Sequence, residues 1–245
     1  MKEDEHKTPG IWVEVHQQIE KQGILLFLRR VVERICCEIW NRALARRLGI
    51  RHVNILQGSY IRGIENFQIG ENFSAGKGFW LEARDKYQGQ YFSPKIVIGE
   101  NVSISFWSHI TAIESVRIGN NVMIGSKVLI IDHNHGCYGP DFHDAPDSPP
   151  YLRDLISGPV VIGDNVWIGD GVIVMPNAII GSGCVIGANA VVRGLIPPNT
   201  IAVGSPARPV KMFDSSSKRW VPVSEESISP VRTHAEINCR NRSNL

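Results

Sequence analysis

The sequence has no long run of apolar residues. Its most apolar early stretch, Ile24 to Leu28, is ended by Arg29 and Arg30, and a membrane span needs about 20 apolar residues. Residues 1–10 are polar and charged, without the apolar core and cleavage site of a signal peptide. From these two absences we expect a protein that is made and kept in the cytoplasm.

The sequence also lacks a strong excess of charge of one sign. Lysine and arginine number 26 and aspartate and glutamate 24, a formal net charge of +2 over 245 residues, which is too small to indicate nucleic-acid binding. The five cysteines form neither a Cys-x-x-Cys metal motif nor an even set for a disulfide framework. We therefore expect reduced thiols.

What the sequence does contain is a six-residue repeat. Large aliphatic residues hold the first place of six consecutive blocks, and glycine fills the second place of four: Ile162, Gly163, Ile168, Gly169, Val174, Ile180, Gly181, Ile186, Gly187 and Val192. This period matches neither a helix nor a two-residue alternation. It is typical of a parallel β-helix, in which three short strands make one coil and inward side chains stack from coil to coil. A β-sandwich would instead show strands at a spacing of about 8–12 residues.

The corners of such coils need residues that tolerate positive φ. Glycine, asparagine and aspartate gather between the blocks in the pairs Asp164-Asn165, Asp170-Gly171, Pro176-Asn177, Ser182-Gly183 and Ala188-Asn189. A less regular form of the repeat begins after Ile50 and is interrupted at residues 85–95 and, at greatest length, at 132–159. Long loops in a regular solenoid are the first place to look for a functional site.

These patterns divide the chain into three parts. Residues 1–49 form an amphipathic helical segment, 50–212 a β-helix domain with the long loop 132–159, and 213–245 a tail, poor in apolar residues and largely disordered, with a short packed piece near Trp220. Between residues 11 and 48, apolar residues recur at helical spacing with arginines among them. This segment can rest on an anionic membrane surface, or it can pack on its own protein with a solvated basic face.

The mouth of the long loop carries the most reactive residue types. Asp132-His133-Asn134-His135-Gly136 places two histidines beside a carboxylate, but a zinc site needs three or four ligands and no further cluster falls near them. We therefore expect no metal. A histidine can act as general base toward an alcohol, or it can simply bond to backbone in the loop.

The blocks, Asn134-His135, Val166-Trp167-Ile168-Gly169 and Gly204-Ser205-Pro206-Ala207 resemble the hexapeptide-repeat acetyltransferases of the galactoside, maltose and xenobiotic type over about residues 50 to 212. With its basic N-terminal helix and the string 131–136, the chain is most similar to bacterial O-acetyltransferases of lipopolysaccharide O-antigen synthesis. The resemblance implies a left-handed β-helix, a homotrimer with active sites between neighbouring subunits, and acetyl-coenzyme A as acyl donor.

Matching positions assign roles by the same resemblance. His135 falls on the family's catalytic histidine and is expected to be the general base, so no cysteine nucleophile is needed. Ser105 stands where galactoside-type members have an asparagine in the acceptor pocket; this departure suggests a different acceptor or orientation. The other residues expected at the acceptor are Trp107, Asn134, Tyr151 and Arg153.

The acyl donor has its own set of matching positions. Gly125, Trp167, Gly169 and Ala188 match residues that contact the pantetheine arm, and Arg193, Arg208 and Lys211 match the region that meets the nucleotide's phosphates. A solvated basic edge is the alternative explanation for the last three.

The leading hypothesis is an acetyl-coenzyme A-dependent O-acetyltransferase acting on a sugar hydroxyl of a cell-surface polysaccharide precursor, with a saccharide that can be lipid-linked. It would work in the cytoplasm, at the inner membrane if the N-terminal helix meets lipid. One alternative is acetylation of an antibiotic or small free sugar. Another is a non-catalytic or metal-binding β-helix, the latter using His133, His135 and a further histidine such as His109.

Overall fold

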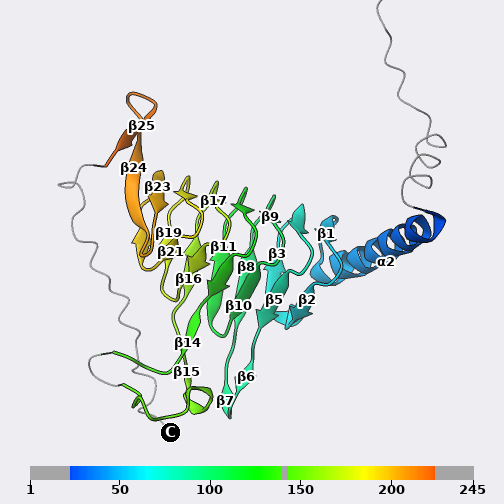
Figure 1. The fold of residues 1–245 in the computed structure, drawn as a ribbon, viewed down its shortest axis with the longest axis horizontal. Helices are drawn as coiled ribbons and strands as arrows, with labels where there is room; N and C mark the ends of the chain where they lie inside the picture. Colours follow the sequence, from blue (N-terminus) through cyan, green and yellow to red (C-terminus); the bar gives the residue numbers. More distant parts are fainter. Residues whose placement is uncertain (1–22, 140–142, 224–245) are drawn as a thin grey trace, which may run out of the picture.

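The computed structural model describes residues 23–139 and 143–223. A helix lies at one end of a solenoid of short strands, two arms leave the solenoid on the same side, and a hairpin closes the far end (Figure 1). The walls of the solenoid are three sheets, which wind as a left-handed parallel β-helix. The predicted fold class is confirmed.

Each coil contributes one strand to each sheet. Sheet 1 contains β1 (Val53–Ile55), β4 (Phe73–Ala75), β9 (Ser103–Ile104), β12 (Met123–Ile124), β17 (Trp167–Ile168), β20 (Val185–Ile186), β23 (Thr200–Val203), β24 (Arg208–Asp214) and β25 (Arg219–Pro222). Sheet 2 contains β2 (Tyr60–Arg62), β5 (Trp80–Ala83), β10 (His109–Ala112), β13 (Leu129–Ile131), β18 (Ile173–Val174) and β21 (Val191–Val192). Sheet 3 contains β3 (Phe67–Ile69), which follows the short helix η1 (Ile64–Asn66), β8 (Lys95–Ile98), β11 (Ser115–Ile118), β16 (Val160–Ile162), β19 (Ile179–Ile180) and β22 (Leu195–Ile196).

The six-residue period sets the register of the coils. Ile162 pairs with Ile180, Ile168 with Ile186 and Val174 with Val192, each pair one coil apart. All the first-place residues of the blocks from Ile162 to Val192 are at most 2% exposed. Burial of one such side chain contributes about 2 kcal/mol, so the stacked column is the main source of stability.

The corners have the backbone that the sequence predicted. Asn165, Gly171, Asn177, Gly183 and Asn189 all have positive φ, between 56° and 72°. A second set of corner asparagines forms a ladder, because the side-chain amide of each donates to the next coil: Asn72 to Asn101 at 2.8 Å, Asn101 to Asn121 at 3.1 Å and Asn121 to Asn165 at 3.3 Å.

The glycines in the second place of the blocks are required by coil stacking. A Cβ added to Gly119 would lie 2.7 Å from the carbonyl carbon of Gly163, and one added to Gly125 would lie 2.7 Å from the backbone nitrogen of Asp170. Both distances are shorter than real Cβ contacts, so successive coils could not approach without glycine.

The helix α2 (Ile24–Leu48) ends at Gly49, whose φ of 72° is left-handed. The helix is anchored to the first coil from its middle onward. The side chain of Gln57 donates to the backbone oxygen of Glu33, the side chain of Asn41 accepts from the backbone N–H of Ile55 at 2.9 Å, and Leu44 and Ala45 are buried. The earlier part of the predicted helix, residues 11–22, lies outside the described residues. Within the described ranges, no helix is long and apolar enough to cross a membrane.

Two arms leave sheet 2 on one side of the molecule (Figure 1). The hairpin arm, residues 85–95, contains β6 (Lys86–Tyr87) and β7 (Gln90–Tyr91). The histidine arm, residues 132–159, contains β14 (His133–His135), the short helix η2 (Pro150–Leu152) and β15 (Leu155–Ser157), with β14 and β15 antiparallel. Gln90 joins the arms: its side-chain oxygen accepts from the backbone N–H of Leu155 at 2.7 Å.

The C-terminal end corrects the predicted tail. β24 pairs antiparallel with β23 and β25 with β24, and Phe213 meets Trp220 edge to face at 5.4 Å. The expectation of a largely disordered tail from residue 213 is therefore wrong for residues 213–222, although the packed piece near Trp220 is present. The hairpin covers the open edge of sheet 1. Residues 224–245 lie outside the described part.

The cysteines differ in one respect from expectation. Cys36, Cys37 and Cys184 are free thiols, whereas Cys137 takes part in a disulfide. The expectation of reduced thiols is therefore wrong for Cys137.

Candidate active site

The imidazole of His135 is exposed at the end of β14 and lies between the two arms. Its Nδ1 is 3.4 Å from Tyr87 Oη, and the two rings meet edge to face at 5.3 Å. Tyr87 Oη also donates to the backbone oxygen of Tyr151 at 2.9 Å, and Tyr138 Oη donates to the backbone oxygen of His135 at 2.7 Å. These contacts fix both the backbone and the ring of His135.

The surroundings of His135 favour its neutral form. Burial lowers its pKa from the ordinary 6.5, and the positive charges of His133 and Arg84 lower the pKa further, while a hydrogen bond to the carbonyl of Pro150 opposes the shift. At neutral pH the ring therefore keeps a lone pair that can accept a proton.

Asp132 and His133 form a buried pair at the base of the histidine arm. Asp132 is 0% exposed, and its carboxylate accepts the ring N–H of His133 at 2.8 Å. The same carboxylate accepts the backbone N–H groups of Glu114 and Ser115, both at 2.8 Å. These bonds cap the turn between β10 and β11. His133 is 7% exposed, so His135 is the more accessible imidazole of the two.

A buried carboxylate on sheet 2 was missed from the sequence. Glu82 is 2% exposed; it accepts from Trp80 Nε1 at 3.2 Å and pairs with Arg84 at 3.1 Å. Beside it, burial lowers the pKa of His109, the charge of Glu82 raises it, and His133 lowers it. His109 Nε2 is buried with no hydrogen-bond partner in the described part of the chain. The available signal was a carboxylate inside an apolar strand, Trp80-Leu81-Glu82-Ala83.

Three of the seven residues predicted for the acyl donor, Gly125, Gly169 and Ala188, stack at the corner between sheets 1 and 2. Backbone N–H groups of Ser105, Gly125 and Gly169 each donate to the next coil at 2.8 Å, and Ala188 follows Gly169 in the same column. We call Ser105, Gly125, Gly169 and Ala188 the corner column. Trp167, 51% exposed, lies beside it on β17. Ser105, predicted at the acceptor, thus stacks with residues predicted for the acyl donor.

The predicted phosphate-binding cations lie toward the C-terminal end. Arg208 and Lys211 are exposed on β24, in register with Val203 and Ile201 of sheet 1. Arg193 is exposed after β21, at the far side of sheet 2. The structure therefore groups two of the three with the corner column and places Arg193 apart.

The remaining predicted acceptor residues are spread over several elements. Trp107 lies over Gly78 at the corner between sheets 1 and 2. Asn134 is half-buried in β14, opposite Ile156, and Tyr151 is exposed. Arg153 directs its guanidinium to the loop itself, donating to the backbone oxygen of Ser148 at 2.6 Å and to Tyr138 Oη at 2.6 Å.

Within one chain, the corner column and the histidine arm lie on different edges of the solenoid. The corner column lies before the strands of sheet 2, and the histidine arm leaves after β13, between sheets 2 and 3. Within the part of the chain that the structure describes, no hydrogen bond joins His135 to the column. Among the described residues, no group of three or more His, Cys, Asp or Glu side chains is placed so that it could hold a metal ion.

The repeat, the solenoid and the arm with an accessible histidine define the class of bacterial hexapeptide transferases, and residues 159–194 match the family described as bacterial transferase hexapeptide (six repeats). The chain is 42% identical over 162 residues to WbbJ of Escherichia coli K12, which is named as a lipopolysaccharide biosynthesis O-acetyl transferase; the match covers 66% of this chain and 79% of WbbJ. It is 31% identical over 153 residues to the galactoside O-acetyltransferase of the same organism, covering 62% and 70%.

The chain therefore belongs to the hexapeptide-repeat acetyltransferases, and it is an acetyltransferase whose acyl donor is acetyl-coenzyme A. Among solved structures, AntD, an N-acyltransferase from Bacillus cereus in complex with dTDP and 3-hydroxybutyryl-CoA, has a TM-score of 0.54 at 21% identity, covering 67% of this chain and 82% of AntD. That likeness supports the fold.

Proposed function

We propose that the protein transfers an acetyl group from acetyl-coenzyme A to a hydroxyl of a sugar in a cell-surface polysaccharide precursor of the lipopolysaccharide O-antigen kind, with His135 as general base. The observation that carries the proposal is the accessible imidazole of His135, which is held between two arms and has a lowered pKa. The acceptor class is supported by the similarity to WbbJ.

In the proposed reaction, acetyl-coenzyme A supplies an acetyl group activated as a thioester. The neutral ring of His135 accepts the proton of the sugar hydroxyl as its oxygen attacks the thioester carbonyl. When the carbon–sulfur bond breaks, the imidazolium returns this proton to the departing sulfur. The products are the acetyl ester and free coenzyme A, so no side chain needs to be acylated.

We propose that the active enzyme is a homotrimer with its sites between copies. The separation of the corner column and the histidine arm on different edges of one chain supports this arrangement. Two copies packed edge to edge would bring His135 of one copy beside Gly125, Gly169 and Ala188 of the next. Arg208 and Lys211 would then meet the phosphates of the acyl donor.

We also propose that the protein works at the cytoplasmic face of the inner membrane. Support comes from α2, which exposes Leu25, Val32, Ile35 and Ile39 at 53–79% of their surface and carries arginines between them. An exposed amphipathic basic helix suits an anionic lipid surface.

The test is an acetyl-transfer assay on the full chain, following free thiol release and the mass of the product. Acceptors would include O-antigen oligosaccharides, small free sugars and aminoglycosides; activity confined to the last two groups would overturn the proposed acceptor. His135→Ala should abolish transfer and leave binding of coenzyme A intact, whereas His143→Ala, an exposed histidine on the same arm, should change little. Near-normal turnover in His135→Ala would remove the proposed base.

A further inference from the structure

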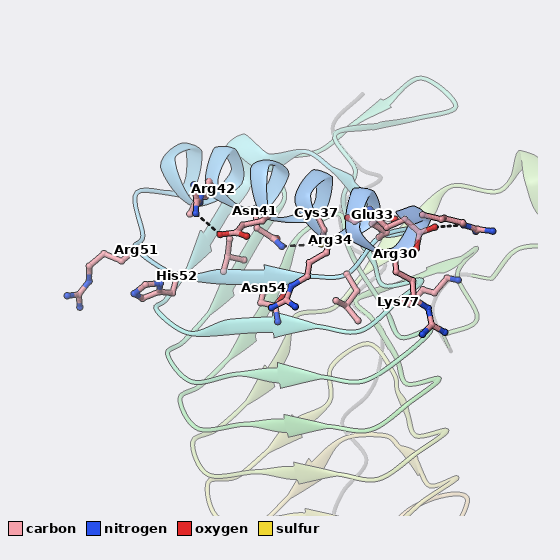
Figure 2. A pocket seen from close by; sticks show the side chains of 16 residues that line it. Arg30, Glu33, Arg34, Cys37, Asn41, Arg42, Arg51, His52, Asn54 and Lys77 are labelled. Atoms are coloured by element: carbon pink, nitrogen blue, oxygen red, sulfur yellow. Dashed lines mark hydrogen bonds and ion pairs between the residues drawn. The ribbon is translucent and has the colours of Figure 1, made fainter. Parts of the chain in front are cut away.

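A basic groove lies between α2 and the first coils, away from the histidine arm (Figure 2). Its volume is about 880 Å³, a size typical of small-molecule sites. Six cationic side chains line it, against the two carboxylates of Glu33 and Glu38: Arg29, Arg30, Arg34, Arg42, Arg51 and Lys77. We call it the α2 groove.

The groove has a local excess of positive charge. The whole chain has a formal net charge of only +2, and the α2 groove alone holds a larger local excess. Its two carboxylates are already paired, Glu33 with Arg29 at 2.7 Å and Glu38 with Arg42 at 2.5 Å. A concave surface lined by one sign of charge attracts ligands of the opposite sign.

Two further cations line the groove from its two sides, Arg34 from α2 and Lys77 from the coils. Arg34 and Lys77 have no ion-pair or hydrogen-bond partner within the described residues. Figure 2 shows Arg30 and Arg34 reaching from α2 toward β1, with Asn54 and Lys77 on the side of the coils. Guanidinium groups bind phosphate through paired N–H donors and lysine adds a point charge, so the arrangement suits more than one phosphate.

The groove is separate from the apolar stripe of α2. Leu25, Leu28, Val32, Ile35 and Ile39 follow one another at three- and four-residue spacing and are exposed, whereas the groove-lining residues of the helix, such as Arg30, Arg34 and Asn41, fall on the opposite side by the same spacing. A ligand of the groove is therefore recognised by charge and not by insertion of the helix into lipid.

We propose that the α2 groove binds a diphosphate group, carried either by a soluble molecule or by the headgroup of a lipid. Arg30 and Arg34 bind it from the helix, and Lys77 and the amide of Asn54 bind it from the coils. The site is independent of acetyl transfer, since it involves none of the residues of the proposed active site.

The experiment uses the full chain with inorganic pyrophosphate as probe, followed by calorimetry at physiological salt. The double variant Arg34→Gln, Lys77→Gln should weaken pyrophosphate binding by tenfold or more. The matched control Arg46→Gln, Arg47→Gln also removes two positive charges, both from α2 outside the groove, and should change binding by less than twofold. Equal losses in both variants, or no binding by the unaltered protein, would overturn the proposal.

A second experiment identifies the molecule that carries the diphosphate. Vesicles of phosphatidylcholine, with and without a lipid diphosphate, are sedimented with each variant. Loss of binding to the diphosphate vesicles in the groove variant alone assigns a lipid headgroup, and unchanged vesicle binding beside lost pyrophosphate binding assigns a soluble ligand. Melting temperature and acetyl transfer to a soluble acceptor are measured for both variants, so that a failure of the proposed function is seen separately.

Discussion

The charge state of His135 is set by neighbours that come from other elements. His133 stands two residues away on the same arm, but Arg84 follows β5, Tyr87 belongs to the hairpin arm and Pro150 to η2. Asp132 anchors the arm by accepting backbone N–H groups of the preceding corner. A sequence motif can indicate which histidine reacts, but only the fold brings together the groups that keep it neutral.

Activity should depend on pH through His135. Because its pKa is lowered from 6.5, kcat/KM should hold at neutral pH and fall only as the pH drops below the ordinary histidine value. Arg84→Gln removes a positive charge that lowers this pKa, so the acidic limb should move to higher pH. The measurement is kcat/KM from about pH 5 to 9. Lys86→Gln is the control, because it removes a charge two residues away, on the hairpin arm, where the ammonium lies 4.8 Å from the Tyr91 ring. An identical shift in Lys86→Gln would contradict the assignment.

Tyr87 should position the imidazole without taking part in proton transfer. Tyr87→Phe keeps the edge-to-face ring contact and loses the hydroxyl that bonds to Tyr151 and lies near Nδ1 of His135. Loss of one such bond corresponds to about 1 kcal/mol, so we expect kcat to fall about fivefold with little change in KM. Tyr91→Phe, 76% exposed on the same hairpin, is the control. A change in KM alone would instead assign Tyr87 to the acceptor.

Among the structural elements, the sequence predicts the coils that follow the six-residue repeat and misses contacts that occur only once in the fold. The six-residue period located the buried column from Ile162 to Val192 and the corner residues of positive φ. The junction of the arms, through Gln90 and Leu155, joins residues far apart in sequence and leaves no periodic signal. β24 escaped prediction for another reason: nearly all its side chains are exposed, so no apolar alternation marks it as a strand.

Coil spacing should be sensitive to a single methyl group. Gly119→Ala places a Cβ 2.7 Å from the backbone of Gly163, and the coils must separate to accept it. Such overpacking costs about 1–3 kcal/mol, which should appear as a lower melting temperature. Gly89→Ala is the comparison, because its Cβ meets nothing within 4 Å and only its φ of 86° is unfavourable, at a cost of about 1 kcal/mol. An equal or smaller loss at Gly119 would show that the stack tolerates the added volume.

At the scale of the whole molecule, the corner column and His135 lie on different edges of one chain. The family resemblance assigned both to one site, but the sequence pattern alone gave no reason to place them together. Gly125, Gly169 and Ala188 stack along one edge, as the period of the blocks requires. His135 lies beyond the other end of sheet 2. No spacing within a single chain relates these edges, because the proposed relation is between copies.

Mixed trimers should test that relation directly. His135→Ala removes the base, and Ala188→Trp fills the corner column; each variant alone should be inactive. If a site takes His135 from one copy and the column from the next, every trimer that contains both variants has one intact site of three. Trimers purified through a different tag on each variant should therefore regain about a third of wild-type activity. If both groups served within one chain, no mixture could restore a site, and the mixed trimers would stay as inactive as a mixture of two differently tagged His135→Ala preparations.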